Sequence, residues 1–271
     1  MCFKKFKFIF GLYLFITGFA EGKVLSVYED APIEIEFSKA DNQTLVIFDC
    51  NEVIFTSDDP LPTPINKKIF KKLRSYLQKR TTKSQYYDLM LKIRKQINHK
   101  LVNPKWPHLI SVLQSRGIKT LMITAHWTGP FKNIAHLEDI RRDEVLSFGI
   151  NFKKSWPDLD TINFKKLPAT SPDYGLHWYP VFKDGIICSC NLEKGKVLRA
   201  FLKNLKYKFK KIIFIDNQMK HINSVRKIAD EFGMEYVGIE YKKSEKIPTG
   251  KVKYEEEKKF VDRLIETGKW R

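Results

Sequence analysis

The stretch TLVIFDC at residues 44–50 decides the fold, because an unbroken apolar run ends there in an acid. Such a run is typical of a central parallel strand that is buried on both faces. The segments IKTLMIT (118–124) and KIIFID (211–216) have the same character. These three segments alternate with stretches of helical periodicity, which predicts an α/β fold: a parallel sheet with helices on both faces.

The remaining segments continue this alternation. Apolar residues recur at helical spacing within 65–100, 105–116, 130–148, 193–205, 218–232 and 252–268. Residues 235–240 predict a further strand, and VFKDGIICSC (181–190) predicts a β-hairpin that turns at Asp184-Gly185. The chain has 271 residues, of which 43% are hydrophobic, and this suits one α/β domain with an insertion.

Polar side chains stand at the ends of the three buried strands. Asp49 and Asp216 close the first and the third, and Thr124 ends the second. The carboxyl ends of neighbouring parallel strands converge on one crevice, and Lys194, at the start of a predicted helix, is placed to reach it. Carboxylate oxygens suit a hard cation such as Mg²⁺, and an ammonium and a hydroxyl suit phosphoryl oxygens. The pattern therefore predicts a site for a divalent cation and a phosphate.

The order of these segments resembles the four motifs of the haloacid-dehalogenase superfamily. They read LVIFDCNEVIFT, TLMITA, EKGKVLRAFL and KIIFIDN in this chain, and the resemblance covers residues 44–240. It implies a Rossmannoid parallel sheet as the core, with a small, mainly helical cap inserted between the first and second motifs. Residues 21–55 and 104–271 would then form the core, and residues 56–103 the cap.

The resemblance also implies roles for the site residues. Asp49 would attack the phosphoryl group and form an aspartyl-phosphate, which divides one difficult step into two. Thr124 would hydrogen-bond the phosphoryl group, and Lys194 would neutralise charge on Asp49 and the phosphate, with Lys196 as the alternative. Asp49, Asp216 and the backbone carbonyl of Asn51 would hold Mg²⁺.

Two positions depart from the family's pattern. Asn51 stands where the usual phosphatases have a second Asp that protonates the leaving group, and an amide cannot donate that proton. The neighbouring Glu52 is expected to point elsewhere, because a shift of one residue redirects the side chain. The enzyme should therefore be slow on alkyl phosphates and prefer aryl phosphates or other good leaving groups. Asn217 replaces another acid of many relatives, which weakens the negative cluster.

These observations predict a Mg²⁺-dependent phosphatase acting on phosphate monoesters, with a phosphorylated small molecule or a phosphoprotein as its substrate. The two asparagines keep an alternative open. In that alternative the chain retains the fold, has lost the reaction, and serves as a secreted binding or effector protein. The sequence does not indicate an oligomeric state.

Residues 1–20 read as a signal peptide. Lys4, Lys5 and Lys7 precede an apolar run at residues 8–20, and cleavage is expected after Ala20. The run is shorter than the ~20 residues that a membrane-spanning helix needs. We therefore expect an exported protein, either periplasmic or secreted, and the sequence leaves open an uncleaved anchor in the membrane.

The chain is strongly basic and poor in cysteine. It has 49 Lys and Arg against 31 Asp and Glu, a formal net charge of +18, which favours anionic ligands and leaves peripheral contact with an acidic membrane open. The basic residues are spread along the chain, and neither a zinc-finger spacing nor an RNA-binding motif is present, so the charge does not indicate nucleic-acid binding. Cys50, Cys188 and Cys190 remain after cleavage, and we expect buried thiols, with one bridge left open.

Overall fold

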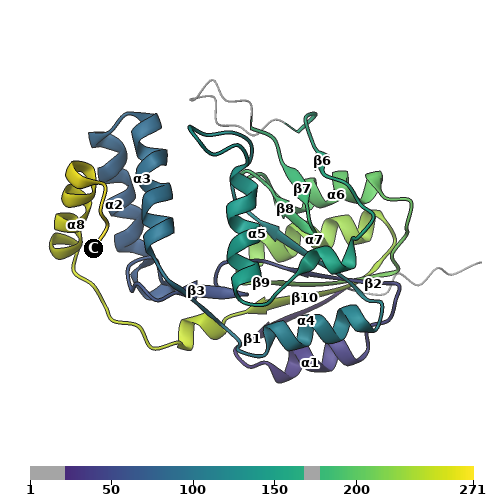
Figure 1. The fold of residues 1–271 in the computed structure, drawn as a ribbon. Helices are drawn as coiled ribbons and strands as arrows, with labels where there is room; N and C mark the ends of the chain where they lie inside the picture. The colour runs from purple at the N-terminus through teal and green to yellow at the C-terminus, as the bar shows by residue number, and fades with distance from the viewer. Residues whose placement is uncertain (1–21, 168–177) are drawn as a thin grey trace, which may run out of the picture.

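The computed structural model describes residues 22–167 and 178–271 and contains an eight-stranded sheet with helices on both faces (Figure 1). The strand order is β1-β10-β9-β2-β5-β8-β7-β6. In this order, the first six strands, β1 through β10, β9, β2 and β5 to β8, pair in parallel with their neighbours. The β8–β7 and β7–β6 pairs are antiparallel. β3 and β4 form a separate antiparallel pair. This Rossmann-like arrangement confirms the predicted α/β fold class.

The strands of the large sheet are β1 (Lys23–Val27), β2 (Thr44–Phe48), β5 (Lys119–Thr124), β6 (Ile162–Asn163), β7 (Val181–Lys183), β8 (Ile186–Cys188), β9 (Lys211–Asp216) and β10 (Glu235–Tyr241). The small sheet has β3 (Phe55–Ser57) and β4 (His99–Leu101). The helices are α1 (Ala31–Ser38), α2 (Lys67–Arg80), α3 (Lys83–Gln96), α4 (Trp106–Ser115), α5 (Leu137–Ser147), α6 (Lys194–Asn204), α7 (Met219–Glu231) and α8 (Tyr254–Thr267).

The central strands are buried on both faces, as the apolar runs predicted. In β2, Leu45 and Ile47 pack into the hydrophobic layer of α6 and α7, whereas Val46 and Phe48 pack into that of α1 and α4. Successive side chains of a strand point to opposite faces, so the interior of a strand between two helical layers has no place for a charged side chain. This is why Asp49 and Asp216 come only where the apolar runs of β2 and β9 end.

The predicted helical stretch 65–100 is two helices followed by a strand. Thr82 interrupts it with a capping box: its hydroxyl accepts from the Gln85 N–H at 3.3 Å, and the Gln85 side chain accepts from the Thr82 N–H at 2.9 Å. The expectation of a helix up to residue 100 is wrong, because His99–Leu101 pairs with β3. The predicted helix 130–148 begins only at Leu137.

The helices of the cap are covered by the C-terminal helix. Side chains of α8, among them Val261 and Leu264, share one hydrophobic cluster with Leu73 and Leu77 of α2. Figure 1 shows α8 beside α2, reached by an extended segment that leaves the sheet. The C-terminal helix α8, which the sequence analysis assigned to the core, thus packs against α2.

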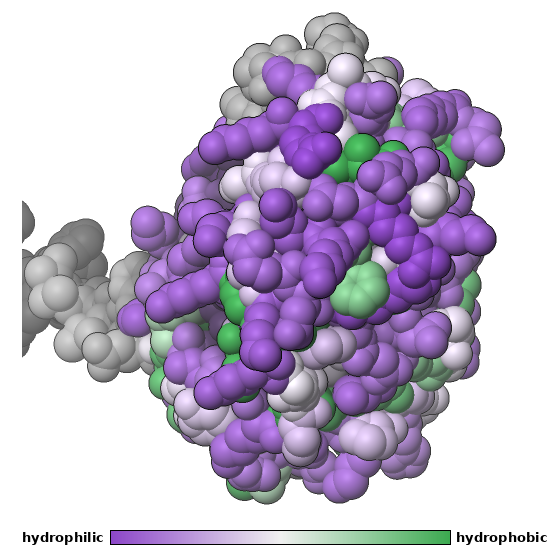
Figure 2. All heavy atoms as spheres, turned by 90° about the vertical axis from the view of Figure 1, so that its left-hand side faces the viewer, coloured by the Kyte–Doolittle hydropathy of each residue, from purple (hydrophilic) through white to green (hydrophobic). Residues whose placement is uncertain are grey.

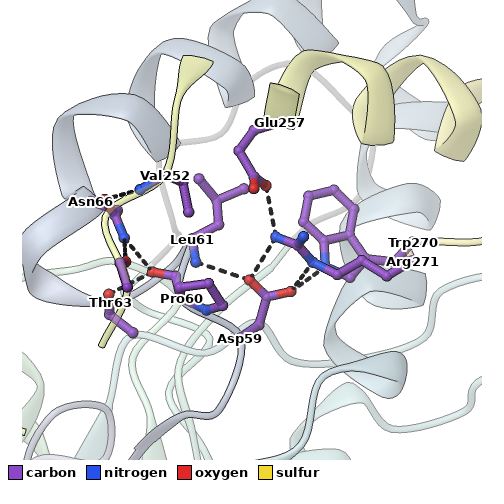
Figure 3. A network of polar contacts seen from close by, with 10 residues as sticks. Asp59, Pro60, Leu61, Thr63, Asn66, Val252, Glu257, Trp270 and Arg271 are labelled. Carbon is purple, nitrogen blue, oxygen red and sulfur yellow. Dashed lines mark hydrogen bonds and ion pairs between the residues drawn. The ribbon is translucent and has the colours of Figure 1, made fainter. Parts of the chain in front are cut away.

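Polar contacts fasten the C-terminal segment to the connection between β3 and α2 (Figure 3). Asp59 accepts from the Trp270 indole N–H at 2.8 Å and from Arg271 Nη2 at 3.0 Å. Farther along, the Asn66 amide donates to the Gly250 carbonyl at 2.8 Å and accepts from the Val252 N–H at 3.2 Å. The segment between β10 and α8 is thus a third connection between core and cap. The other two are the points where the chain enters and leaves the inserted cap segment.

Candidate active site

Three neighbouring strands bring the predicted acids and the hydroxyl to one edge of the sheet. β9, β2 and β5 are adjacent, and Asp216, Asp49 and Thr124 lie at their carboxyl ends. The Asp49 N–H donates to the Ile215 carbonyl at 2.8 Å, so the chain stays alongside β9 up to the acid. Asp216 is fully buried, while Asp49 and Thr124 are 7% and 2% exposed. The sequence therefore identified the edge at which the ionisable groups meet.

Lys194 joins the two acids. Its Nζ lies 2.6 Å from Asp49 Oδ1 and 2.6 Å from Asp216 Oδ2, whereas Lys196 is exposed. The next residue, Gly195, allows the start of α6 to lie against α7, which brings Lys194 to the two acids. A Cβ at residue 195 would lie 2.3 Å from the Ser224 carbonyl oxygen, and the Gly195 N–H donates to Ser224 Oγ at 2.8 Å. Only a glycine lets the start of α6 approach α7 so closely.

The charged groups of Asp49, Asp216 and Lys194 lie close enough to shift the pKa values of Asp216 and Lys194. Burial and the nearby Asp49 carboxylate raise the pKa of Asp216 to about 7, although Lys194 acts in the opposite direction. Burial would lower the pKa of Lys194, but the two carboxylates outweigh it and raise that pKa above its usual value. With both acids ionised, the cluster has one negative charge in excess, and a cation is the natural complement.

The residues present fit a magnesium ion. Asn217 lies next to Asp216, and its side-chain Oδ1 is buried without a hydrogen-bond partner among the described residues. Two carboxylates, an amide oxygen and a backbone carbonyl are hard oxygen donors of the kind that Mg²⁺ prefers. Within the described ranges no group of three or more His, Cys, Asp or Glu side chains is placed to hold a metal, so water would complete the octahedral shell.

Asn51 and Glu52 lie in the turn that follows Asp49. Asn51 is exposed, and Glu52 has a left-handed backbone conformation with a φ of 65°. The Glu52 carboxylate accepts from Thr56 Oγ1 at 3.1 Å, and burial raises its pKa to about 7. Both residues line one cavity, and the Glu52 carboxylate is turned toward Thr56.

This cavity has a volume of about 400 Å³ and lies between the sheet edge and the cap. The core contributes Asn51, Glu52, Thr124 and His126, and the cap contributes side chains of α2 and α3. The residues of α2 and α3 on its wall are Phe70, Arg74, Met90, Leu91, Ile93 and Arg94. A group bound there would therefore meet the turn after β2 and the end of β5 on one side and the α2–α3 segment on the other, whereas Asp49, Lys194 and Asp216 are not part of the wall.

A second polar network crosses from the cap to the core. Arg94 of α3 forms a two-pronged ion pair with Glu144 of α5, and Arg141 donates to the same carboxylate at 2.9 Å. His126 Nε2 lies 2.9 Å from the Leu137 carbonyl and Nδ1 lies 3.2 Å from Arg94 Nη1. Burial and the two arginines hold the pKa of His126 well below its usual value, so it is neutral, donates from Nε2 and accepts from Arg94.

The cysteines take no part in this chemistry. Cys50, Cys188 and Cys190 are buried free thiols, and no disulfide occurs among the described residues. Burial raises the pKa of Cys50 to about 12 and that of Cys190 to about 11, so their reactive thiolates are scarce at neutral pH.

Comparison with known proteins places the chain among sequence relatives. The model of a family described as "Protein of unknown function (DUF2608)" matches residues 28–260. The chain belongs to this family. The match includes Asp49, Thr124, Lys194 and Asp216, so the whole charged cluster lies within the family's region.

Similar proteins occur in several Rickettsia species, and each is described as uncharacterized. A protein of Rickettsia bellii (strain RML369-C) is 25% identical over 228 residues, which cover 81% of this chain and 76% of the relative. A Rickettsia conorii protein is 24% identical over 245 residues, covering 87% and 81%. A Rickettsia prowazekii protein is 23% identical over 249 residues, covering 87% and 80%. No solved structure matches the chain.

Proposed function

We propose that this chain is an exported, Mg²⁺-dependent phosphatase of the haloacid-dehalogenase type, which hydrolyses phosphate monoesters through Asp49. One observation carries the proposal: Lys194 Nζ lies within 2.6 Å of both Asp49 and Asp216, at the ends of adjacent parallel strands. The four sequence motifs that resemble this superfamily meet at that place. A buried pair of acids with one lysine is unsuited to a purely structural role, since such a cluster costs stability.

The proposed reaction has two steps. A carboxylate oxygen of Asp49 attacks phosphorus, the bond from phosphorus to the ester oxygen breaks, and the leaving group departs with that electron pair. Water then attacks the phosphorus of the aspartyl-phosphate, the bond to the Asp49 oxygen breaks, and inorganic phosphate leaves. Lys194 neutralises Asp49 and the transferred oxygens, and Thr124 donates a hydrogen bond to them. Asp49, Asp216 and the Asn51 carbonyl would hold Mg²⁺, which supplies further positive charge.

The test is hydrolysis of para-nitrophenyl phosphate by the purified chain in MgCl₂ and in EDTA. We expect turnover in MgCl₂ and its loss in EDTA, because the cluster then keeps an excess negative charge that repels the substrate. Restoring MgCl₂ should restore the rate. Absence of turnover in both solutions would favour the alternative, a binding or effector protein that keeps the fold, which Asn51 and Asn217 support.

Asn51→Asp is expected to raise the rate on an alkyl phosphate by about 10²-fold or more, because it supplies the missing proton donor at the cavity wall. The gain with para-nitrophenyl phosphate should be much smaller, since nitrophenolate leaves without protonation. Steady-state phosphate release from the two substrates measures both rates. Equal gains with both substrates, or none with the alkyl ester, would contradict the proposed reason for the aryl preference.

Export rests on the predicted signal peptide at residues 1–20, which lies outside the described residues. In the part of the chain that the structure describes, no helix has the length and apolar character required to cross a membrane. The face formed by the cap and α8 is mainly hydrophilic, with only scattered hydrophobic side chains (Figure 2). We therefore propose a periplasmic or secreted location for the protein. Its proposed substrate is a small phosphorylated molecule or a phosphoprotein.

A further inference from the structure

The cavity below the cap has an excess of positive charge. Arg74, Arg94 and Arg141 line it, and Glu52 is the only carboxylate among the described residues of its wall. Its two histidines have lowered pKa values, chiefly because of burial, and are therefore neutral at pH 7. Such a wall attracts an anion into a space that is partly shielded from water.

Glu144 does not balance the two inner arginines. It is a single carboxylate shared by Arg94 and Arg141, and no other described carboxylate forms an ion pair with either arginine, although the Asp49 charge acts on Arg141 from a greater distance. Arg141 is 2% exposed, and its Nε has no hydrogen-bond partner among the described residues. A buried guanidinium with unmet hydrogen bonds is costly, and an anion reaching it would supply both the charge and the acceptor oxygens.

The transferred phosphoryl group has other proposed partners, Lys194 and Thr124. Thr124 lies at the end of β5, and Lys194, at the start of α6, reaches Asp49 and Asp216 at the ends of β2 and β9. Arg94 comes from α3 of the cap and is held by His126 and Glu144. Thr124, Arg94 and Arg141 line the same cavity, so a substrate whose phosphoryl group is bound by Thr124 would extend into the space that the two arginines line.

We propose that Arg94 and Arg141 form a second anion subsite, so that the natural substrate is a small phosphate monoester whose leaving group bears a carboxylate or a second phosphate. This inference rests on the proposed function. The body of the leaving group would lie among the apolar side chains of the wall, which include Phe55, Phe70 and Trp127. A cavity of about 400 Å³ accepts a compact molecule of this kind.

The binding test uses a matched pair of compounds, carboxyphenyl phosphate and carbamoylphenyl phosphate, each as its para and meta isomers. The pair differs in one negative charge and hardly in shape. Calorimetric titration of the Asp49→Asn variant, which should not consume them, is expected to show about tenfold tighter binding of the carboxylate in at least one isomer. Adding Arg141→Met should bring the ratio of the two affinities close to one.

Two further variants make the result decisive. Arg94→Met should also abolish the preference, and it decides the question if Arg141→Met fails to fold. Arg142→Met is the matched control: it is the adjacent arginine of α5, pairs with Asp139 and Asp143, and is absent from the cavity wall, so the preference should persist. Equal binding of carboxylate and amide by the Asp49→Asn variant in both isomers would overturn the subsite.

Turnover of the carbamoyl compound by the chain with Asp49 intact reports separately on the proposed function. Its absence would refute the phosphatase, while the affinity ratio would still decide the subsite. In an active enzyme, Arg141→Met should lower kcat/KM for the carboxylate compound about tenfold and leave the carbamoyl compound nearly unchanged. An equal loss with both compounds would overturn the inference and assign Arg141 to the phosphoryl group.

Discussion

Asp49→Asn is expected to lower the rate of para-nitrophenyl phosphate hydrolysis by about 10⁴-fold or more, because an amide oxygen cannot form the covalent phosphoryl intermediate. Asn is close to Asp in size, and Asp49 is 7% exposed, so the turn that follows β2 should keep its shape. Initial rates at saturating MgCl₂ measure the effect. The same variant should fail to retain labelled phosphate after acid quenching, whereas the unaltered chain should retain it.

The fold of this variant provides the control. The Asp49 charge raises the pKa of Asp216, so its removal should lower that pKa and favour the ionised form paired with Lys194. The variant should therefore unfold at a temperature equal to or above that of the unaltered chain. Activity that survives in a well-folded variant would show that Asp49 is not the nucleophile.

Lys194→Met is expected to lower the free energy of unfolding by about 3–5 kcal/mol at pH 8 in EDTA, because it leaves two buried carboxylates without their cation. At that pH, above the Asp216 pKa of about 7, Asp216 is ionised in the unaltered chain. Urea unfolding followed by circular dichroism measures the change. The loss should be smaller at pH 5, where Asp216 binds a proton and the repulsion falls.

Lys196→Met is the matched control, since Lys196 is exposed, and we expect a change within about 0.5 kcal/mol. Adding MgCl₂ should recover part of the stability of Lys194→Met, because the ion offsets the same two charges. Equal effects of the two substitutions would contradict the assignment of Lys194 to the site.

The fold class and the charged cluster were predictable because both follow from one local signal. A strand between two helical layers must be apolar until it ends, so Asp49, Thr124 and Asp216 stood out at the ends of their runs. Lys194 was predictable only together with the motif around it, and Gly195 explains why it is placed there. For these strands, the residue that ends the apolar run in the sequence is also the residue that lies at the site.

The rest of the cavity was not predictable, because it depends on contacts between distant segments. Arg94 and Arg141 look like ordinary surface residues of charged helices, and only the docking of α3 against α5 joins them through Glu144. Glu52 faces the cavity because the turn adopts a left-handed φ, which no periodicity reveals. The first helix, APIEIEFS at 31–38, even alternates apolar and acidic residues as a strand would.

The position of α8 has a consequence for how the protein is made. The hydrophobic cluster of the cap needs Leu264 and Trp270 beside Leu73 and Leu77, which are synthesised about 190 residues earlier. At a synthesis rate of about 5–20 residues per second, α2 is complete roughly ten seconds or longer before α8 is made. During that interval their apolar faces are uncovered, so a nascent chain halted before residue 254 should be the form that chaperones hold.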